Sequence, residues 1–214
     1  IFNRLLAASL LTVLPVQAQP TDDKQQLLHA IATAPSPANI ERDIARLVGF
    51  GTRHTLSETE SDTRGIGAAR RWIKAEFERI SADCGGCLEV SYSSGVIEGE
   101  DRIPNATDVV SVIAVQRGKT DPGRYVIMAG DIDSRVSDVM DFTSDAPGAN
   151  DNASGVAGAL EAARVLSKYQ FNGTIVYAAL SGEEQGLFGG KILAAQAQEA
   201  GWRIKAVLNN DMIG

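Results

Sequence analysis

Three apolar runs that have the composition of short strands each end in carboxylates, the side chains in this sequence best suited to chemistry. In an open α/β sheet the carboxyl ends of the strands form the ligand crevice, so we expect these acids to meet at one edge. They are Asp131 and Asp133 after residues 125–129, Glu183 and Glu184 after residues 174–180, and Asp211 after residues 206–208.

A sixth acid, Asp151, precedes a segment with helical periodicity. Taken singly, each acid has a structural explanation as a helix cap, a partner of a helix dipole or a solvated loop residue. Several carboxylates gathered in a partly buried crevice repel one another, and such a site needs raised pKa values or a bound cation. A metal ion is therefore the simplest prediction.

The adjacent residues Glu183 and Glu184 can have different chemical roles, because successive residues leaving a strand point in different directions. One carboxylate can ligate a metal while its neighbour faces the substrate. This arrangement suits metal-assisted hydrolysis, in which a carboxylate that does not ligate takes a proton from water.

The elements that must position these acids alternate between helices and strands. Such alternation predicts a mostly parallel sheet with helices on both faces. The expected helices are 22–34, 39–48, 64–82, 156–168 and 187–198, and the expected strands are 88–93, 109–116, 125–129, 174–180 and 204–208.

Composition excludes several classes of protein. The 214 residues are 44% hydrophobic and 22% charged, as in a globular domain. Twenty Lys and Arg against 27 Asp and Glu give a net charge of −7. This acidic balance disfavours binding to nucleic acid or to an anionic membrane, which requires an excess of basic residues. Two Cys and two His are too few for a Cys/His zinc finger. We expect His29 and His54 to have structural or surface roles.

The first 18 residues have the pattern of a signal peptide, with Arg4, a short apolar run and a small residue at Ala18. This predicts a periplasmic or secreted protein with residues 19–214 as the mature part and no membrane association after cleavage. In an oxidising compartment, Cys84 and Cys87 are expected to form a local structural disulfide.

Four ordered motifs between residues 130 and 214 resemble the secreted di-zinc aminopeptidase family. This family includes bacterial leucyl aminopeptidases and aminopeptidase Y, with glutaminyl cyclases and transferrin-receptor ectodomains as relatives. The resemblance implies a three-layer α/β/α sandwich with a mixed, mostly parallel central sheet. Residues 19–214 would be the N-terminal part of a single catalytic domain, truncated at the C-terminus. The motifs are Gly130-Asp-Ile-Asp-Ser134, Pro147-Gly-Ala-Asn-Asp-Asn-Ala-Ser-Gly155, Ser181-Gly-Glu-Glu-Gln-Gly-Leu-Phe-Gly189 and Asn209-Asn-Asp-Met-Ile-Gly214.

The same resemblance implies two divalent metal ions, expected to be zinc, and a role for each acid. Asp151 would bridge the two ions, Glu184 would ligate one of them and Asp211 the other, and Asp131 would be a further metal ligand. Glu183 would be the general base, and Asp133 would orient the ligand at position 131.

Two departures from the family pattern bear on the metal. Asp131 stands where the family has His, and another His ligand of the family comes from a later segment that these 214 residues do not contain. An all-oxygen ligand set suits Mg, Ca or Mn better than zinc, although Asp also binds zinc.

The predicted function is an exported metallo-aminopeptidase that acts on peptides with a free N-terminus. Two alternatives stay open. One is a degenerate family member that acts as a binding or scaffold module, and the other is a glutaminyl cyclase-like acyltransferase.

Overall fold

The computed structural model describes residues 21–214, with side chains from residue 23 onward. The chain divides into two units at Thr33, and each is described by itself. Helix α1 (Thr21–Thr33) lies in the first unit, and its described side chains are exposed except for half-buried Ile31. The predicted signal peptide lies outside the described residues. None of the described helices has the length and apolar character needed to cross a membrane.

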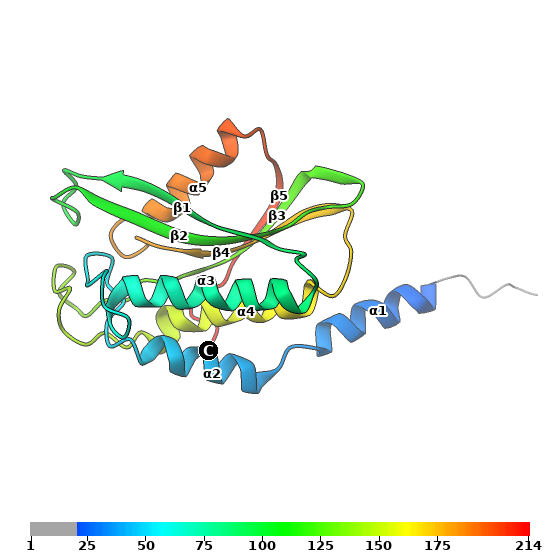
Figure 1. Cartoon of the computed structure of the whole chain (residues 1–214), viewed down its shortest axis with the longest axis horizontal. Helices are drawn as coiled ribbons and strands as arrows, with labels where there is room; N and C mark the ends of the chain where they lie inside the picture. Colours follow the sequence, from blue (N-terminus) through cyan, green and yellow to red (C-terminus); the bar gives the residue numbers. More distant parts are fainter. Residues whose placement is uncertain (1–20) are drawn as a thin grey trace, which may run out of the picture. The chain divides into compact units, whose positions relative to one another are not determined.

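The second unit is built on a five-stranded sheet with the order β1-β2-β4-β3-β5 (Figure 1). Strand β3 is parallel to both β4 and β5, whereas β2 is antiparallel to both β1 and β4. The strands are β1 (Glu89–Ile97), β2 (Thr107–Gln116), β3 (Asp121–Asp131), β4 (Gly173–Leu180) and β5 (Arg203–Asn209).

The mixed sheet is confirmed, but its parallel pairings do not outnumber the antiparallel ones among the described strands. The reason is the connection between β1 and β2. These strands follow each other through a loop without a crossover helix, so they pair as an antiparallel hairpin. Parallel pairing begins only where α4 and α5 provide crossovers.

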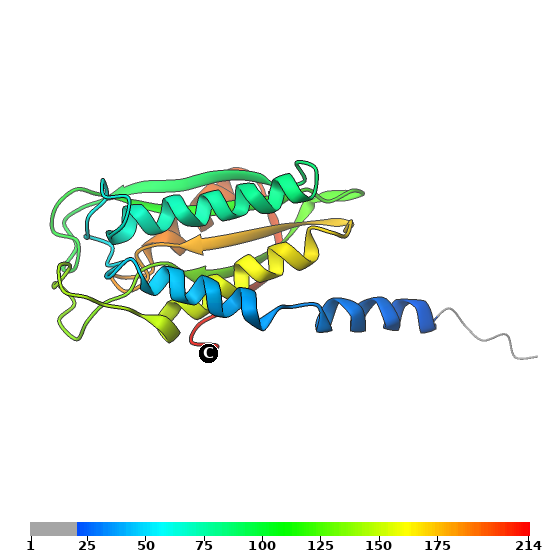
Figure 2. The same cartoon turned by 60° about the horizontal axis from the view of Figure 1, so that its bottom comes forward.

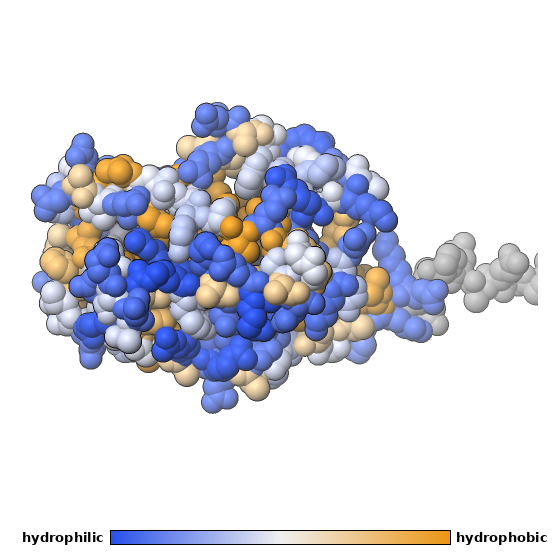
Figure 3. All heavy atoms as spheres, viewed as in Figure 1, coloured by the Kyte–Doolittle hydropathy of each residue, from blue (hydrophilic) through white to orange (hydrophobic). Residues whose placement is uncertain are grey.

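Helices cover both faces of the sheet and make the expected three layers (Figures 1 and 2). On one face lie α2 (Pro37–Val48), α3 (Gly65–Asp83) and α4 (Gly155–Leu166), which share a core cluster with residues of β2 and β4. On the other face α5 (Phe188–Glu199) contributes Leu193 to a second core cluster. The outer surface over α2, α3 and α4 is mostly hydrophilic (Figure 3), as expected for amphipathic helices.

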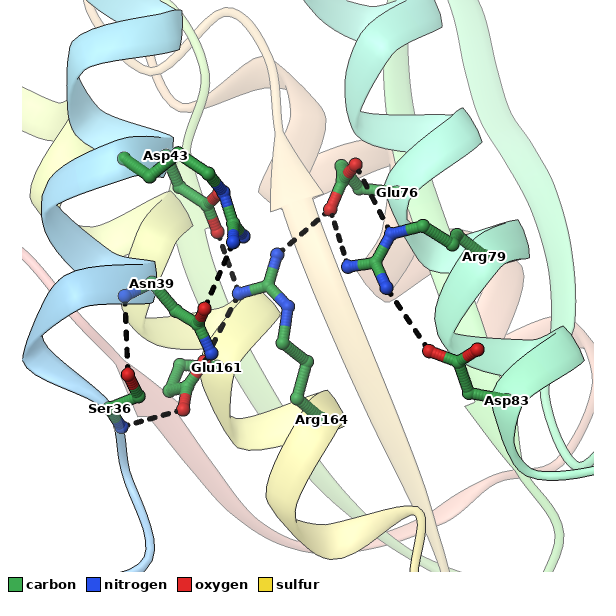
Figure 4. A network of polar contacts seen from close by, with 9 residues as sticks. Ser36, Asn39, Asp43, Glu76, Arg79, Asp83, Glu161 and Arg164 are labelled. Carbon is green, nitrogen blue, oxygen red and sulfur yellow. Dashed lines mark hydrogen bonds and ion pairs between the residues drawn. The ribbon is translucent and has the colours of Figure 1, made fainter.

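A buried polar network joins the three helices of the first face (Figure 4). Arg164 on α4 pairs with Asp43 of α2 at 2.7 Å, with Glu76 of α3 at 3.0 Å and with Glu161 at 3.1 Å. Asp43 is fully buried, and its charge is compensated by the guanidinium groups of both Arg164 and Arg42, the latter at 2.8 Å. The network therefore ties the helical layer together away from the acid-bearing strand ends.

Candidate metal and catalytic site

The sheet brings the predicted acids to one edge. Because β3 is parallel to β4 and β5, Asp131 pairs with Leu180, and Ala129 pairs with Asn209. The chain segments that carry the other acids begin immediately after these paired residues. The predicted convergence of the three strand ends is thus present in the fold.

Two glycines allow strand β3 to meet the start of α4. A Cβ atom on Gly130 would lie 2.3 Å from the backbone carbon of Gly155, and one on Gly155 would lie 2.0 Å from the carbonyl oxygen of Asn210. Asn210 is held by its backbone N–H, which donates to the carbonyl of Ala129 at 2.8 Å. Larger side chains would separate the elements that carry Asp131, Asp151 and Asp211.

Asp133 organises the turn that carries the two glutamates. Its side chain is only 1% exposed. The backbone N–H groups of Glu183 and Glu184 donate to its two carboxylate oxygens at 3.2 and 3.0 Å, and the Thr55 hydroxyl donates to Oδ2 at 3.0 Å. Burial raises the pKa of Asp133 while these hydrogen bonds oppose the rise. Its described hydrogen-bond partners are therefore the glutamate turn and Thr55, and the predicted orienting role toward position 131 stays a prediction.

Glu183 has the properties of a proton acceptor. Burial raises its pKa to about 7, and the charges of Asp133, Glu184, Asp131 and Asp211 add to the rise. Within residues 23–214 no hydrogen bond or ion pair engages its carboxylate. A carboxyl group with a pKa near neutrality is suited to general base catalysis at neutral pH.

Asp131 lies in the polar interior of the site and is 5% exposed. Its Oδ2 accepts hydrogen bonds from the side-chain amides of Asn152 at 3.2 Å and Asn209 at 3.4 Å. Burial, followed by the charge of Asp133, raises the pKa of Asp131 to about 6. Asn152 belongs to the turn segment Ala149–Ser154, where the Asp151–Asn152 peptide bond is cis.

Two arginines hold Glu184. The Arg135 guanidinium pairs with the Glu184 carboxylate, and Arg102 donates to the Glu184 carbonyl at 2.7 Å. Burial raises the pKa of Glu184, and Arg135 opposes this rise. The partners therefore keep this predicted ligand in place.

Asp151 and Asp211 are exposed, and neither carboxylate makes a hydrogen bond or an ion pair within residues 23–214. Both still act on the site through their charge, since Asp151 raises the pKa of Glu184 and Asp211 raises the pKa of Glu183. Among the four predicted metal ligands, these are the two whose carboxylates have no described partner, since Asp131 and Glu184 are both engaged.

The donor set fits a divalent cation in charge and chemistry, because it consists of carboxylate oxygens, and burial together with like charge raises the pKa values of Asp131 and Glu183. As they stand, no three His, Cys, Asp or Glu side chains of the described part of the chain are grouped closely enough to hold a metal ion. A complete site requires movement of the exposed acids or ligands beyond these residues.

A cavity of about 600 Å³ lies among the loops at this edge of the sheet. The N-terminal end of β2 forms part of it, because β2 is antiparallel to β4 and begins where β4 ends. The cavity combines apolar side chains with one arginine and one aspartate. Among its lining residues are Leu56, Arg70, Asp108, Met140 and Phe142.

Other predictions concern cysteine and histidine. Cys84 and Cys87 form the predicted disulfide, with Cα atoms 5.6 Å apart. His29 is exposed on α1. His54 is fully buried, and its Nε2 lies 3.0 Å from the carbonyl of Val139.

The sequence interpretation missed Thr55, Asn152 and Arg53 as supports of the acids. Asn152 lies within a recognised motif, so its position next to Asp151 was an available signal. Thr55 and Arg53 lie about 80 residues before the acids they support, and nothing local in the sequence marks them.

Residues 111–214 match the family described as Peptidase family M28. The chain is 46% identical over 199 residues to a protein of Leptosphaeria maculans named "Probable zinc metalloprotease", covering 93% of this chain and 45% of that protein. It is 47% identical over 178 residues to a protein of the same description from Pyricularia oryzae, covering 83% of this chain and 36% of that protein. The chain thus spans less than half the length of these relatives.

Solved structures share the fold. LapB from Legionella pneumophila superimposes with a TM-score of 0.67 at 24% identity, over 88% of this chain and 46% of LapB. Glutaminyl cyclase from Porphyromonas gingivalis gives a TM-score of 0.65 at 22% identity, over 84% of this chain and 60% of the enzyme. These structures show the fold over most of the chain. The half of the chain that carries the acid-bearing motifs, residues 111–214, matches Peptidase family M28.

Proposed function

We propose that the protein is a zinc-dependent aminopeptidase that removes N-terminal residues from peptides. The observation that carries this proposal is the position of Glu183, a carboxyl group with a pKa of about 7 and no partner among the described residues, at the edge where the other acids meet. The names of the curated relatives support zinc as the metal.

In this proposal Asp131, Asp151, Glu184 and Asp211 hold two zinc ions, together with ligands from parts of the protein beyond these residues. A bound divalent cation acidifies water and polarises the scissile carbonyl group. Glu183 accepts the proton from the attacking water and passes it to the departing amine. Asp133 keeps Glu183 in place through the hydrogen bond to its backbone N–H.

The choice of an N-terminal substrate rests on charge. The site gathers six carboxylates near one edge of an acidic chain, and such a site attracts a protonated α-amine. None of the six acids lines the cavity, but Thr55 lines it and donates to Asp133, so we propose the cavity as the space for a substrate side chain, with Met140 and Phe142 as apolar contacts. Export to the periplasm or the outside of the cell is part of the proposal, and the Cys84–Cys87 disulfide supports it.

The test uses the full-length protein loaded with zinc and a panel of aminoacyl-4-nitroanilides, each with an N-acetylated counterpart. We expect hydrolysis of the free-amine substrates only, with loss of activity after chelation and return of activity with zinc. Cleavage of the acetylated substrates would indicate an endopeptidase. No hydrolysis of any substrate by a zinc-loaded protein would exclude the aminopeptidase.

Glutaminyl cyclase chemistry is tested in the same experiment with a peptide that begins with Gln. Loss of ammonia without peptide cleavage would indicate the cyclase. A binding module is favoured by the Asp at position 131, and it predicts peptide binding by calorimetry without turnover in either assay.

A further inference from the structure

The segment Thr52–Thr55 is buried and contacts the acid-bearing loops through hydrogen bonds of Arg53 and Thr55. Arg53 is 0% exposed and is the largest side chain of the described chain that is fully buried. Its guanidinium makes no ion pair with any described carboxylate. Burying a cation that touches no carboxylate is costly, so the hydrogen bonds of Arg53 must offset this cost together with the charges of Asp133 and Asp151.

Those hydrogen bonds go to four backbone carbonyls. Nε donates to Ile132 at 2.8 Å, and Nη2 donates to Gly148 at 2.9 Å. Nη1 donates to Pro147 at 2.8 Å and to Leu47 at 3.0 Å. The planar guanidinium can serve several carbonyls at once because it carries five N–H donors in a fixed geometry.

Three of the four partners of Arg53 lie in two separate loops of the site, and the fourth, Leu47, lies in the last turn of α2. Ile132 stands between Asp131 and Asp133 at the end of β3. Pro147 and Gly148 lead directly into the turn that presents Asp151. One buried side chain therefore bridges the two loops that carry three of the predicted site residues.

Packing shows how closely the second loop surrounds this side chain. Gly148 has a φ of +46°, and a Cβ atom added there would lie 2.9 Å from Nη2 of Arg53 and 2.5 Å from Cβ of Ser134. Ser134 also receives the Arg53 backbone N–H at 3.2 Å and donates to the carbonyl of Ala146 at 2.7 Å. The loops and the guanidinium form one packed unit.

The neighbours of Arg53 extend the same support to the glutamate turn. Thr55 donates to Asp133, the carboxylate that accepts from the backbone of Glu183 and Glu184. The His54 ring lies 3.1 Å from the side-chain amide of Gln185. The segment Thr52–Thr55 thus touches all of the loops that carry Asp131, Asp151 and Glu184.

We propose that Arg53 is a positioning residue that sets the spacing between the β3 loop and the Asp151 turn, and so determines the affinity of the site for its metal. The inference rests on the metal site of the proposed function and is independent of which bond the enzyme cleaves. Arg53 acts through the backbone of the ligand loops and does not itself touch metal or substrate.

The experiment compares Arg53→Lys and Arg53→Met with the matched variants Arg164→Lys and Arg164→Met in the full-length protein. Arg164 is an arginine whose side chain is 10% exposed, and it joins the helices of Figure 4 and pairs with no residue of an acid-bearing loop. Zinc affinity is measured by competition with a chromophoric chelator, at a temperature where circular dichroism shows each variant folded.

We expect both pairs to lower the melting temperature and only the Arg53 pair to weaken zinc binding. The expected loss of affinity is about 10-fold to 100-fold, as for other residues that orient metal ligands. Lys keeps the positive charge but lacks the planar fork, so Arg53→Lys separates positioning from charge.

Zinc affinity equal to the wild type in Arg53→Lys would overturn the inference, as would equal losses in the Arg53 and Arg164 variants. If Arg53→Met does not fold, Arg53→Lys against Arg164→Lys decides. A wild-type protein that binds zinc but cleaves no peptide would contradict the proposed function and leave the inference about Arg53 standing. A wild-type protein that binds no zinc would contradict both the proposed function and the inference about Arg53.

Discussion

Strands β4 and β5 both end in predicted site residues, but they hold them in different ways. Residues 174–179 of β4 are all buried, and β4 has hydrogen-bonded neighbours on both sides. Strand β5 lies at the sheet edge, with Val207 57% and Leu208 50% exposed. Glu183 and Glu184 follow the buried strand, and Asp211 follows the exposed one.

This difference extends to the acids themselves. The glutamate turn is tied by Asp133, Arg102 and Arg135, whereas Asp211 has no described side-chain partner. Burial and hydrogen bonding therefore organise one part of the site in advance of any ligand. At the end of β5, Asp211 follows the strand as predicted, but no described side chain fixes the orientation of its carboxylate.

The largest effect is expected for Glu183→Gln in the full-length protein. If Glu183 is the base and not a ligand, turnover falls by about 100-fold to 10,000-fold while zinc content stays near that of the wild type. Glu184→Gln serves as the control, because loss of a ligand lowers zinc occupancy. Metal analysis and kinetics on both proteins check this, and equal loss of zinc in the two variants contradicts the division of roles.

The contrast between held and free acids predicts opposite results for Asp133→Ala and Asp211→Ala. Removing Asp133 leaves three donors without a partner, which costs on the order of 1–3 kcal/mol for each one that stays buried. Removing Asp211 changes the unfolding free energy of the metal-free protein by less than about 0.5 kcal/mol, as is usual for an exposed site. Urea unfolding in the presence of a chelator measures both. Similar losses of unfolding free energy in the two variants would contradict the proposed difference between the buried, hydrogen-bonded Asp133 and the exposed Asp211.

The raised pKa values predict a stability that depends on both pH and metal. The folded pKa of Asp131 is about 6 against 3.8, and that of Glu183 is about 7 against 4.5. The folded chain therefore binds more protons than the unfolded chain in this range, and the metal-free protein loses stability as pH rises from about 4 to 7.

Thermal melting at pH 5 and pH 8, with chelator and then with zinc, tests this dependence. We expect the metal-free melting temperature to be lower at pH 8 by on the order of a few degrees. Zinc should restore stability at pH 8, because it compensates the ionised carboxylates. A metal-free protein that is more stable at pH 8 than at pH 5 would contradict the electrostatic account.

The smallest effect is expected for Asp131→His, which introduces the residue typical of the family. Imidazole is a softer ligand than carboxylate, so the variant should keep its metal content and shift its preference from manganese toward zinc. Asp131→Ala should instead lose metal. Competition between the two ions, followed by metal analysis, distinguishes these results, and unchanged stoichiometry in both variants would mean that Asp131 is not a ligand.

Much of the fold could be predicted from local sequence patterns. The helix expected over residues 64–82 is α3, and the strand expected over 174–180 is β4, because long periodic or apolar segments depend little on context. The strand expected over 125–129 begins earlier, at Asp121. Its polar first residues pair with β4 across an irregular register, which hydrophobicity does not signal.

The sequence by itself determined the identity of the acids, their order and the strand ends that carry them. Those features follow from residue type and from short-range periodicity, which are visible without a fold. Only the tertiary structure decided that Asp133 holds the glutamate turn and that Arg53 bridges two loops about 80 and 95 residues away. These contacts depend on which backbone groups the packed sheet and helices bring together at one buried point. Every residue has a backbone carbonyl, so residue type does not show which of them will accept a hydrogen bond from a distant side chain.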